Sequence, residues 1–194
     1  MGSLIWAKVT EQGISVNKQF FVFGGIAPDL WISCVYRPHF RRLCAGRFYR
    51  LLRRLYSTGG MVGGLPYSFF LGVMTHYLCD FLCYAHTPAF KGGLREHMQY
   101  EKKQKVESAN VLPLLVQKGK DIHYNQLINT LDDFITKRET YLMWGDESPD
   151  AEISIAINMA AWAVTCVYGH AEKASSLNAE ERRNTAGDPV IRAG

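Results

Sequence analysis

Three of the six histidines in this chain lie between positions 76 and 97, and two of them are followed four residues later by a carboxylate. The two pairs are His76 with Asp80 and His97 with Glu101, and His86 lies between them. Residues four apart on an α-helix share one face, so each pair presents an imidazole and a carboxylate toward one point. Imidazole and carboxylate together suit zinc and neighbouring metals. The spacing therefore predicts a metal-binding site.

The surroundings of Asp80 favour the same interpretation. This residue lies in the most apolar stretch of the chain, where an isolated carboxylate is costly unless a cation or a protonated group compensates it. The alternative is a buried hydrogen-bonded pair between His76 and Asp80, with the second pair as a surface contact. Two such pairs together with His86, in a chain with so few histidines, favour metal binding.

Two further candidates lie upstream, each beside a proline. Asp29 occurs in GGIAPDL and His39 in YRPHF, which are loop contexts, and loops commonly carry functional groups. Taken alone, Asp29 could cap a turn and His39 could be a surface imidazole. We treat both as candidate ligands.

Seven arginines crowd around His39 and the helix that follows it. Guanidinium groups bind phosphate through paired hydrogen bonds, so we expect Arg37, Arg41 and Arg42 to bind an anionic substrate. The solvated face of an amphipathic helix is an equally open explanation. The arginines further along would then serve solubility or a partner.

Apolar residues at three- and four-residue spacing predict helices nearly throughout the chain. The fold class is therefore all-α, a single-domain multi-helix bundle over residues 1–174. The polar, aperiodic residues 175–194 are predicted to be a disordered tail. Residues 20–29 and 57–64 are predicted to be turns or breaks, and the predicted helices span residues 4–12, 40–56, 66–86, 94–118, 121–144 and 150–173.

The order of these motifs resembles a known family. GGIAPD, a later histidine, HYLCDFLCYAH and HMQYE follow one another as in the zinc-dependent phospholipase C family of bacteria, whose metal-binding framework the fungal and plant single-strand nucleases share. The resemblance covers roughly residues 23–101 and implies the helical fold of that family. It implies one zinc ion held by Asp29, His39, His76 and Asp80, and a second held by His86, His97 and Glu101.

The resemblance also implies a third metal, bound by an N-terminal tryptophan amino group, a nearby histidine and the aspartate matching Asp80. Trp6 is not the first residue here, and no histidine precedes His39. We therefore expect two zinc ions, with Glu11 as the candidate for rebuilding the third site. We also expect no protein carboxylate to bridge the two ions that remain.

The function that these residues predict is metal-dependent hydrolysis of a phosphoric ester, as by a phospholipase C-like phosphodiesterase or a phosphatase. Metal ions polarise a phosphoryl oxygen and lower the pKa of bound water toward about 7, and Asp29 is the candidate general base. The substrate would be a small phosphoester or a phospholipid, with nucleic acid less favoured. Rival interpretations are a helical di-iron or di-manganese enzyme that handles oxygen, which usually shows ExxH pairs, and a metal-stabilised domain without turnover.

Composition adds little to the function but bears on location. The formal charge of +4 is modest, and no apolar stretch reaches the roughly 20 residues that span a bilayer. No secretory signal is visible, and the five scattered cysteines favour reduced thiols, with Cys79 and Cys83 in the core. We therefore expect a soluble, cytoplasmic protein.

Overall fold

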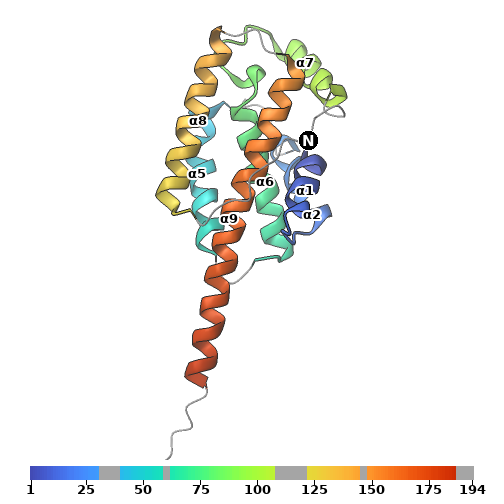
Figure 1. Ribbon diagram of the computed structural model, residues 1–194. Helices are drawn as coiled ribbons and strands as arrows, with labels where there is room; N and C mark the ends of the chain where they lie inside the picture. The colour runs from blue at the N-terminus through green and yellow to red at the C-terminus, as the bar shows by residue number, and fades with distance from the viewer. Residues whose placement is uncertain (31–39, 59–61, 108–121, 145–147, 187–194) are drawn as a thin grey trace, which may run out of the picture.

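Every regular element in the part of the chain that this computed structural model describes is a helix, which confirms the all-α fold class. The structure describes residues 1–30, 40–58, 62–107, 122–144 and 148–186 (Figure 1). The elements are α1 (Gly2–Glu11), α2 (Lys18–Gly24), α3 (Ala27–Leu30), α5 (Arg41–Ser57), α6 (Leu65–Phe81), the 3-10 helix η1 (Tyr84–His86), α7 (Leu94–Glu107), α8 (Tyr124–Trp144) and α9 (Pro149–Ala186).

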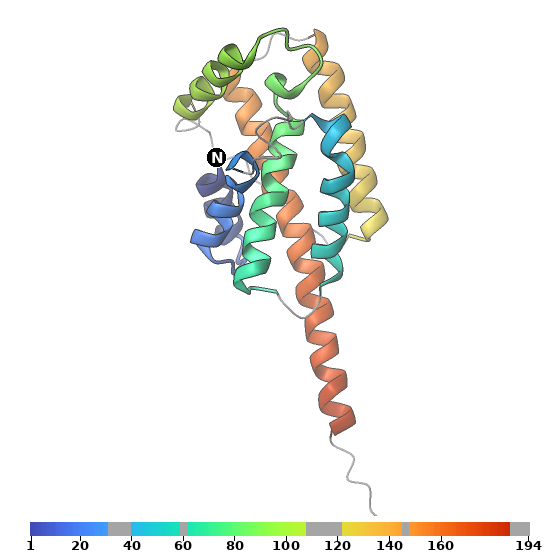
Figure 2. The same ribbon diagram turned by 180° about the vertical axis from the view of Figure 1, so that it is seen from behind.

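Helix α6 is the central element of the bundle. Figure 2 shows α6 with α1 and α2 on one side and α5 on the other, and α6 also packs against α9. Its buried side chains cover most of the helix circumference, as expected for an apolar helix that other helices surround, and the less buried stripe carries His76 and Asp80. Pro66 lies in its first turn, where the missing N–H costs nothing. The predicted helix over residues 66–86 is therefore present, but it ends at Phe81.

The early end of α6 has a tertiary cause. Arg138 of α8 donates from Nε to the Leu82 carbonyl at 3.4 Å, and Glu152 of α9 accepts from the Tyr84 amide at 3.0 Å. Backbone groups at a helix end need such partners, and here they come from other helices. The chain turns at Cys83, which is extended, and η1 then carries His86.

Residues 20–29, predicted to be a turn, belong largely to α2 and α3. The side chain of Asn17 caps α2 by accepting from the Phe20 amide at 3.1 Å, a signal that the sequence analysis did not use. Gly24 packs against α6 so closely that a Cβ there would lie 2.0 Å from the Phe69 carbonyl oxygen, and a Cβ on Gly72 would lie 2.0 Å from that of Phe21. The glycines thus allow two backbones to approach.

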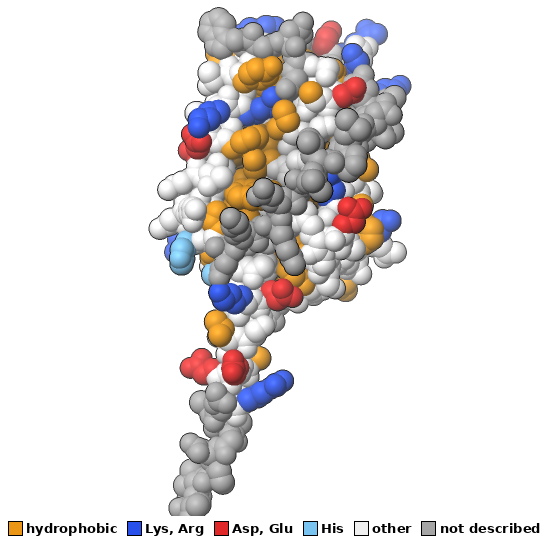
Figure 3. Space-filling model, viewed as in Figure 1, with side chains coloured by type: hydrophobic (Ala, Val, Ile, Leu, Met, Phe, Trp, Pro, Cys, Tyr) orange, Lys and Arg blue, Asp and Glu red, His pale blue; other side chains and the backbone are white. Residues whose placement is uncertain are grey.

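Helix α9 is longer than predicted. It continues to Ala186, so residues 175–186 are helical rather than disordered, and residues 187–194 lie outside the description. Alanine, glutamate, lysine and arginine favour helix without tertiary contacts. Among the described side chains of α9, Ala171 is the last buried one, and beyond it the helix projects from the body (Figure 1). Figure 3 shows both acidic and basic side chains along this projecting part.

The apolar part of α9 also meets the length and composition of a membrane span. The candidate span lies within Pro149–Arg183, and 67% of its most apolar stretch is buried inside the protein. Packing against α1, α5 and α6 therefore accounts for its apolar character. The predicted amphipathic helix α5 likewise buries Phe48, Leu52 and Leu55, while its arginines from Arg42 onward are exposed.

Candidate metal centre

Four of the predicted metal ligands meet at the C-terminal end of α6. His76 and Asp80 lie one turn apart on α6, and His76 Nε2 is 3.1 Å from Asp80 Oδ2. Asp29 comes from α3, with Oδ1 at 3.5 Å from the same Nε2. His86 comes from η1, with Nε2 at 3.7 Å from Asp80 Oδ1. The carboxylates of Asp29 and Asp80 therefore converge on one imidazole nitrogen.

The other nitrogen of His76 fixes the orientation of the ring. Nδ1 lies 3.0 Å from the Gly25 carbonyl oxygen, which can only accept a hydrogen bond, so Nδ1 carries a proton. The close packing of α2 on α6 brings this carbonyl into reach. When the ring is neutral, Nε2 is then the atom with the free lone pair. A backbone carbonyl behind a metal-ligating histidine is a common supporting contact.

The charges around His76 raise its pKa. Burial is the largest single influence and by itself would lower the pKa. The carboxylates of Asp80 and Asp29, with the Gly25 carbonyl, outweigh it and raise the pKa to about 9. The cluster thus stabilises a positive charge at Nε2, and a proton supplies that charge in the metal-free protein.

Asp80 lies near histidines of both predicted ligand sets. Its Oδ2 faces His76 and its Oδ1 faces His86, which the sequence analysis assigned to different ions. The turn at Cys83 directs η1 back toward α6, which brings His86 near Asp80. The expectation that no protein carboxylate bridges the two ions stays a prediction.

His86 and His97 form the second part of the site. Their ring centroids lie 4.7 Å apart at an interplanar angle of 82°, and the Phe90 ring lies 5.9 Å from that of His97. His86 is buried and His97 is half-buried. The tertiary structure therefore places histidines from η1 and α7 side by side.

Some predicted ligands cannot be placed. His39 lies outside the described residues, and α7 includes Glu101 but its side chain is not among those described. Among the side chains that the structure does describe, no group of three or more His, Cys, Asp or Glu residues is arranged to hold a metal ion. The described cluster is thus a partial donor set.

That partial set fits zinc in its chemistry. Imidazole and carboxylate are zinc ligands, the tautomer of His76 leaves Nε2 to accept a metal, and the surrounding carboxylates favour a cation there. Cys79, beside Asp80, is not a comparable ligand, because burial, with a smaller contribution from Asp80, raises the pKa of its thiol against the opposing charge of the amino terminus. Both Cys79 and Cys83 are buried, which confirms that they belong to the core.

A buried acid that the sequence analysis missed lies close by. Glu152, in the first turn of α9, is 1% exposed, and burial raises its pKa. Hydrogen bonds from Cys83, the Tyr84 amide and Tyr100, and the charge of Arg138, oppose that shift. The sequence did contain a signal, because Glu152 directly precedes an apolar helical run, and the cost of burying a carboxylate among apolar residues was the argument made for Asp80.

The predicted substrate arginines have separate outcomes. Arg37 lies outside the described residues. Arg41 binds Asp132 and Glu139 of α8, the latter at 2.9 Å, so its guanidinium joins α5 to α8. Arg42 is exposed, with its guanidinium 5.6 Å from the Phe40 ring centroid.

The two residues named in connection with a third metal, Trp6 and Glu11, both lie in α1. Trp6 donates from its ring nitrogen to the Val16 carbonyl at 3.2 Å, and Lys18 lies 4.7 Å from its ring centroid. Glu11 is exposed at the end of α1. These contacts make Trp6 part of the α1–α2 contact.

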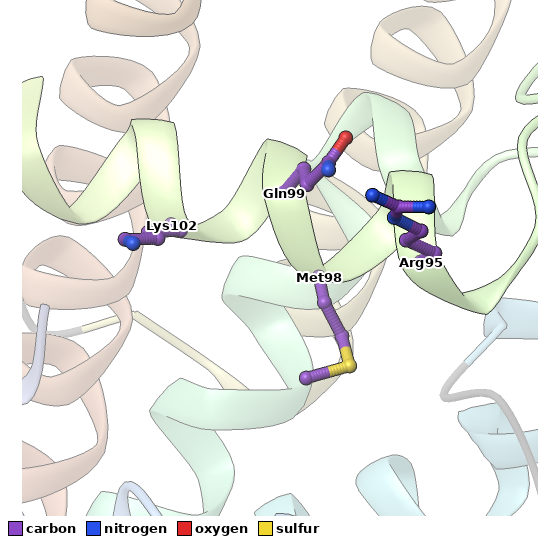
Figure 4. A pocket seen from close by; sticks show the side chains of 4 residues that line it. All are labelled: Arg95, Met98, Gln99 and Lys102. Atoms are coloured by element: carbon purple, nitrogen blue, oxygen red, sulfur yellow. The ribbon is translucent and has the colours of Figure 1, made fainter.

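A surface pocket of about 520 Å³ lies along α7, lined by Arg95, Met98, Gln99 and Lys102. Figure 4 shows these side chains spread along the helix rather than converging on one point. None of the described lining residues is a predicted metal ligand. We assign no substrate to this pocket.

A model of the zinc-dependent phospholipase C family matches residues 1–145. Comparison with curated proteins and with solved structures gives no match. The matched segment contains all seven predicted metal ligands and ends just before α9. Because this match covers more than half of the 194 residues, the chain belongs to the zinc-dependent phospholipase C family.

Proposed function

We propose that this protein hydrolyses a phosphoric ester with the help of bound zinc, as a phospholipase C-like enzyme. The observation that carries the proposal is the convergence of Asp29 and Asp80 on Nε2 of His76. Membership of the zinc-dependent family supports it independently. The proposed zinc ligands are Asp29, His39, His76, Asp80, His86, His97 and Glu101.

Bound zinc supplies electrostatic stabilisation of phosphoryl oxygens and lowers the pKa of water at the site. His76 contributes a neutral Nε2, which the Gly25 carbonyl keeps in one tautomer. Asp80 supplies negative charge on the buried side of the cluster, with a side chain that is 15% exposed. Both residues are held by α6, a rigid and central helix.

Asp29 differs from Asp80 in exposure. Its side chain is 64% exposed, so substrate and water can reach the carboxylate. An accessible carboxylate beside the cluster can accept a proton from an attacking water, which supports Asp29 as general base. It also serves as a ligand in the proposed set.

The proposed substrate is a small phosphoester or a phospholipid. Arg42 is the described arginine that we keep as a candidate for binding phosphate, because it is exposed and Arg41 is engaged by α8. We propose a cytoplasmic location, which the buried free thiols of Cys79 and Cys166 support.

Elemental analysis followed by hydrolysis assays tests the proposal. We expect purified protein to retain zinc and to release product from a panel of phosphate monoesters, phosphate diesters and phospholipid vesicles, with a single-stranded oligonucleotide as comparison. Asp29→Asn should lower turnover on the best substrate, whereas Asp133→Asn, an exposed change on α8, should not. Protein that binds no zinc, or zinc-loaded protein without activity on any phosphoester, would contradict the proposal.

A further inference from the structure

The carboxylate of Glu152 joins the two segments that carry His86 and His97. Its Oε2 accepts from the Tyr84 amide at 3.0 Å and from the Tyr100 hydroxyl at 3.1 Å. Tyr84 begins η1, which ends at His86, and Tyr100 lies about one helical turn after His97 in α7. One buried oxygen therefore ties η1 to α7.

Aromatic packing also connects η1 to α7, but it does not fix the orientation of α7. The Tyr84 and Tyr100 ring centroids are 6.0 Å apart, and Phe90 lies 5.6 Å from Tyr84 and 6.2 Å from Tyr100. Apolar contacts of this kind are non-directional, so they tolerate small rotations of α7 about its axis. A hydrogen bond is directional, and the bond from Tyr100 to Glu152 restricts that rotation.

The turn before η1 is held from the other side by a buried cation. Arg138 of α8, 6% exposed, donates to the Leu82 carbonyl at 3.4 Å, and its charge lowers the pKa of Glu152. The residues between Asp80 and His86 are therefore held by a buried base on α8 and a buried acid on α9. Changes in either would move His86 relative to Asp80.

We propose that Glu152 is a positioning residue of the metal centre, which sets the approach of the His86 and His97 rings through Tyr84 and Tyr100. The inference rests on the proposed zinc chemistry. It also assigns a role to α9, because the family match ends at residue 145 and Glu152 lies beyond it. Outer groups that orient metal ligands commonly change metal affinity by about 10- to 100-fold when they are removed.

Two matched tyrosine variants test the proposal. Tyr100→Phe removes the hydroxyl that donates to Glu152, and Tyr49→Phe removes one that donates to Asp132 at 2.7 Å across α5 and α8. Each deletes one oxygen atom from a contact between helices. Zinc affinity of the purified full chain is measured by competition with a chromogenic chelator, alongside thermal unfolding of the metal-free forms.

We expect Tyr100→Phe to weaken zinc binding about tenfold at the proposed site of His86 and His97. Zinc affinity at the proposed site of His76 should not change. Tyr49→Phe should leave both sites at wild-type affinity. Glu152→Gln keeps an acceptor oxygen but loses the charge, and it should weaken the same site as Tyr100→Phe. If Glu152→Gln does not fold, the two tyrosine variants still decide the question.

Three results would overturn the proposal. Equal zinc affinities in Tyr100→Phe and Tyr49→Phe would show that the bond to Glu152 does not position the histidines. An equal weakening of both zinc sites in Tyr100→Phe would indicate general loosening of the fold. Wild-type protein that binds no zinc would overturn the proposed function as well. The first two results would leave zinc binding by the wild-type protein intact, so failure of the Glu152 proposal can be told apart from failure of the proposed function.

Discussion

At the scale of single residues, the centre depends on how His76 balances the charge around it. Gly25 fixes one ring nitrogen, while Asp29 and Asp80 surround the other. A proton can supply the positive charge that these carboxylates favour at Nε2, and in the proposed site zinc would supply it instead. The two would then compete for one atom, which would make both the stability of the protein and its zinc affinity depend on pH.

The metal-free protein should lose stability between about pH 6.5 and 9. The pKa of His76 rises from an ordinary 6.5 to about 9 in the folded state, so its stabilising charge is fully present below pH 6.5 and is lost as pH rises through 9. The effect is of the order of 3 kcal/mol. Urea unfolding of chelated protein at both pH values measures it, and His76→Gln should remove most of the difference. A stability that is unchanged across this range would contradict the assignment.

Replacing His76 and replacing His97 should each remove a different zinc ion. We expect His76→Ala and His97→Ala each to retain up to one equivalent of zinc, because they belong to different proposed ligand sets. His123→Ala, at an exposed position before α8, is the matched control and should retain the wild-type zinc content. Zinc content after dialysis decides the matter. Because Asp80 lies between His76 and His86, loss of both ions in His76→Ala would mean that Asp80 is shared and the partition is wrong.

At the scale of elements, the site depends on contacts that hold short segments against α6. The glycine contact between α2 and α6 brings the Gly25 carbonyl to His76, and the buried charges of Arg138 and Glu152 end α6 early. Neither α3 nor η1 is long enough to be stable alone. Their positions are therefore set by the helices around them.

Gly72→Ala should destabilise the protein by about 1–3 kcal/mol, the usual cost of overpacking. Its Cβ would lie 2.0 Å from the Phe21 carbonyl oxygen, so α2 must move away from α6. Gly169→Ala is the matched control, because a Cβ there meets nothing within 4 Å. In helix α9 that change should stabilise by about 0.5–1 kcal/mol. Chemical denaturation compares the two, and equal stabilities would mean that α2 and α6 are not in this close contact.

At the scale of the whole molecule, the centre lies where four helical segments meet, and each arrives from a different part of the sequence. Asp29, His76, His86 and His97 come from α3, α6, η1 and α7. A ligand that crosslinks such segments stabilises the folded state, because the unfolded chain cannot offer the same set of donors.

Removal of zinc should therefore lower the melting temperature. At a free zinc concentration about 100 times the dissociation constant, one site contributes about 2.7 kcal/mol to stability. A chelator that strips both ions should lower Tm by several degrees, and added zinc should restore it. Differential scanning calorimetry measures both steps. An identical melting curve for zinc-loaded and fully stripped protein would refute the metal-site interpretation.

The sequence by itself determined the helical class and the residue types of the candidate site. Apolar periodicity depends only on local geometry, so α1, α5 and the start of α6 were predictable, as were the histidine and carboxylate pairs. Recognition of the family followed from the order of those pairs. Periodicity also recovered α8, but it placed the end of α6 five residues too late.

Only the tertiary structure decided which groups meet. The turn at Cys83, the placement of Asp80 between His76 and His86, and the engagement of Arg41 by α8 all depend on partners far away in the chain. Glu152 was missed for the same reason, since its partners Tyr84 and Tyr100 lie on other elements. A pattern within one segment reports which face is apolar. It does not report which distant donor will satisfy a buried carboxylate or a helix end, because that depends on packing.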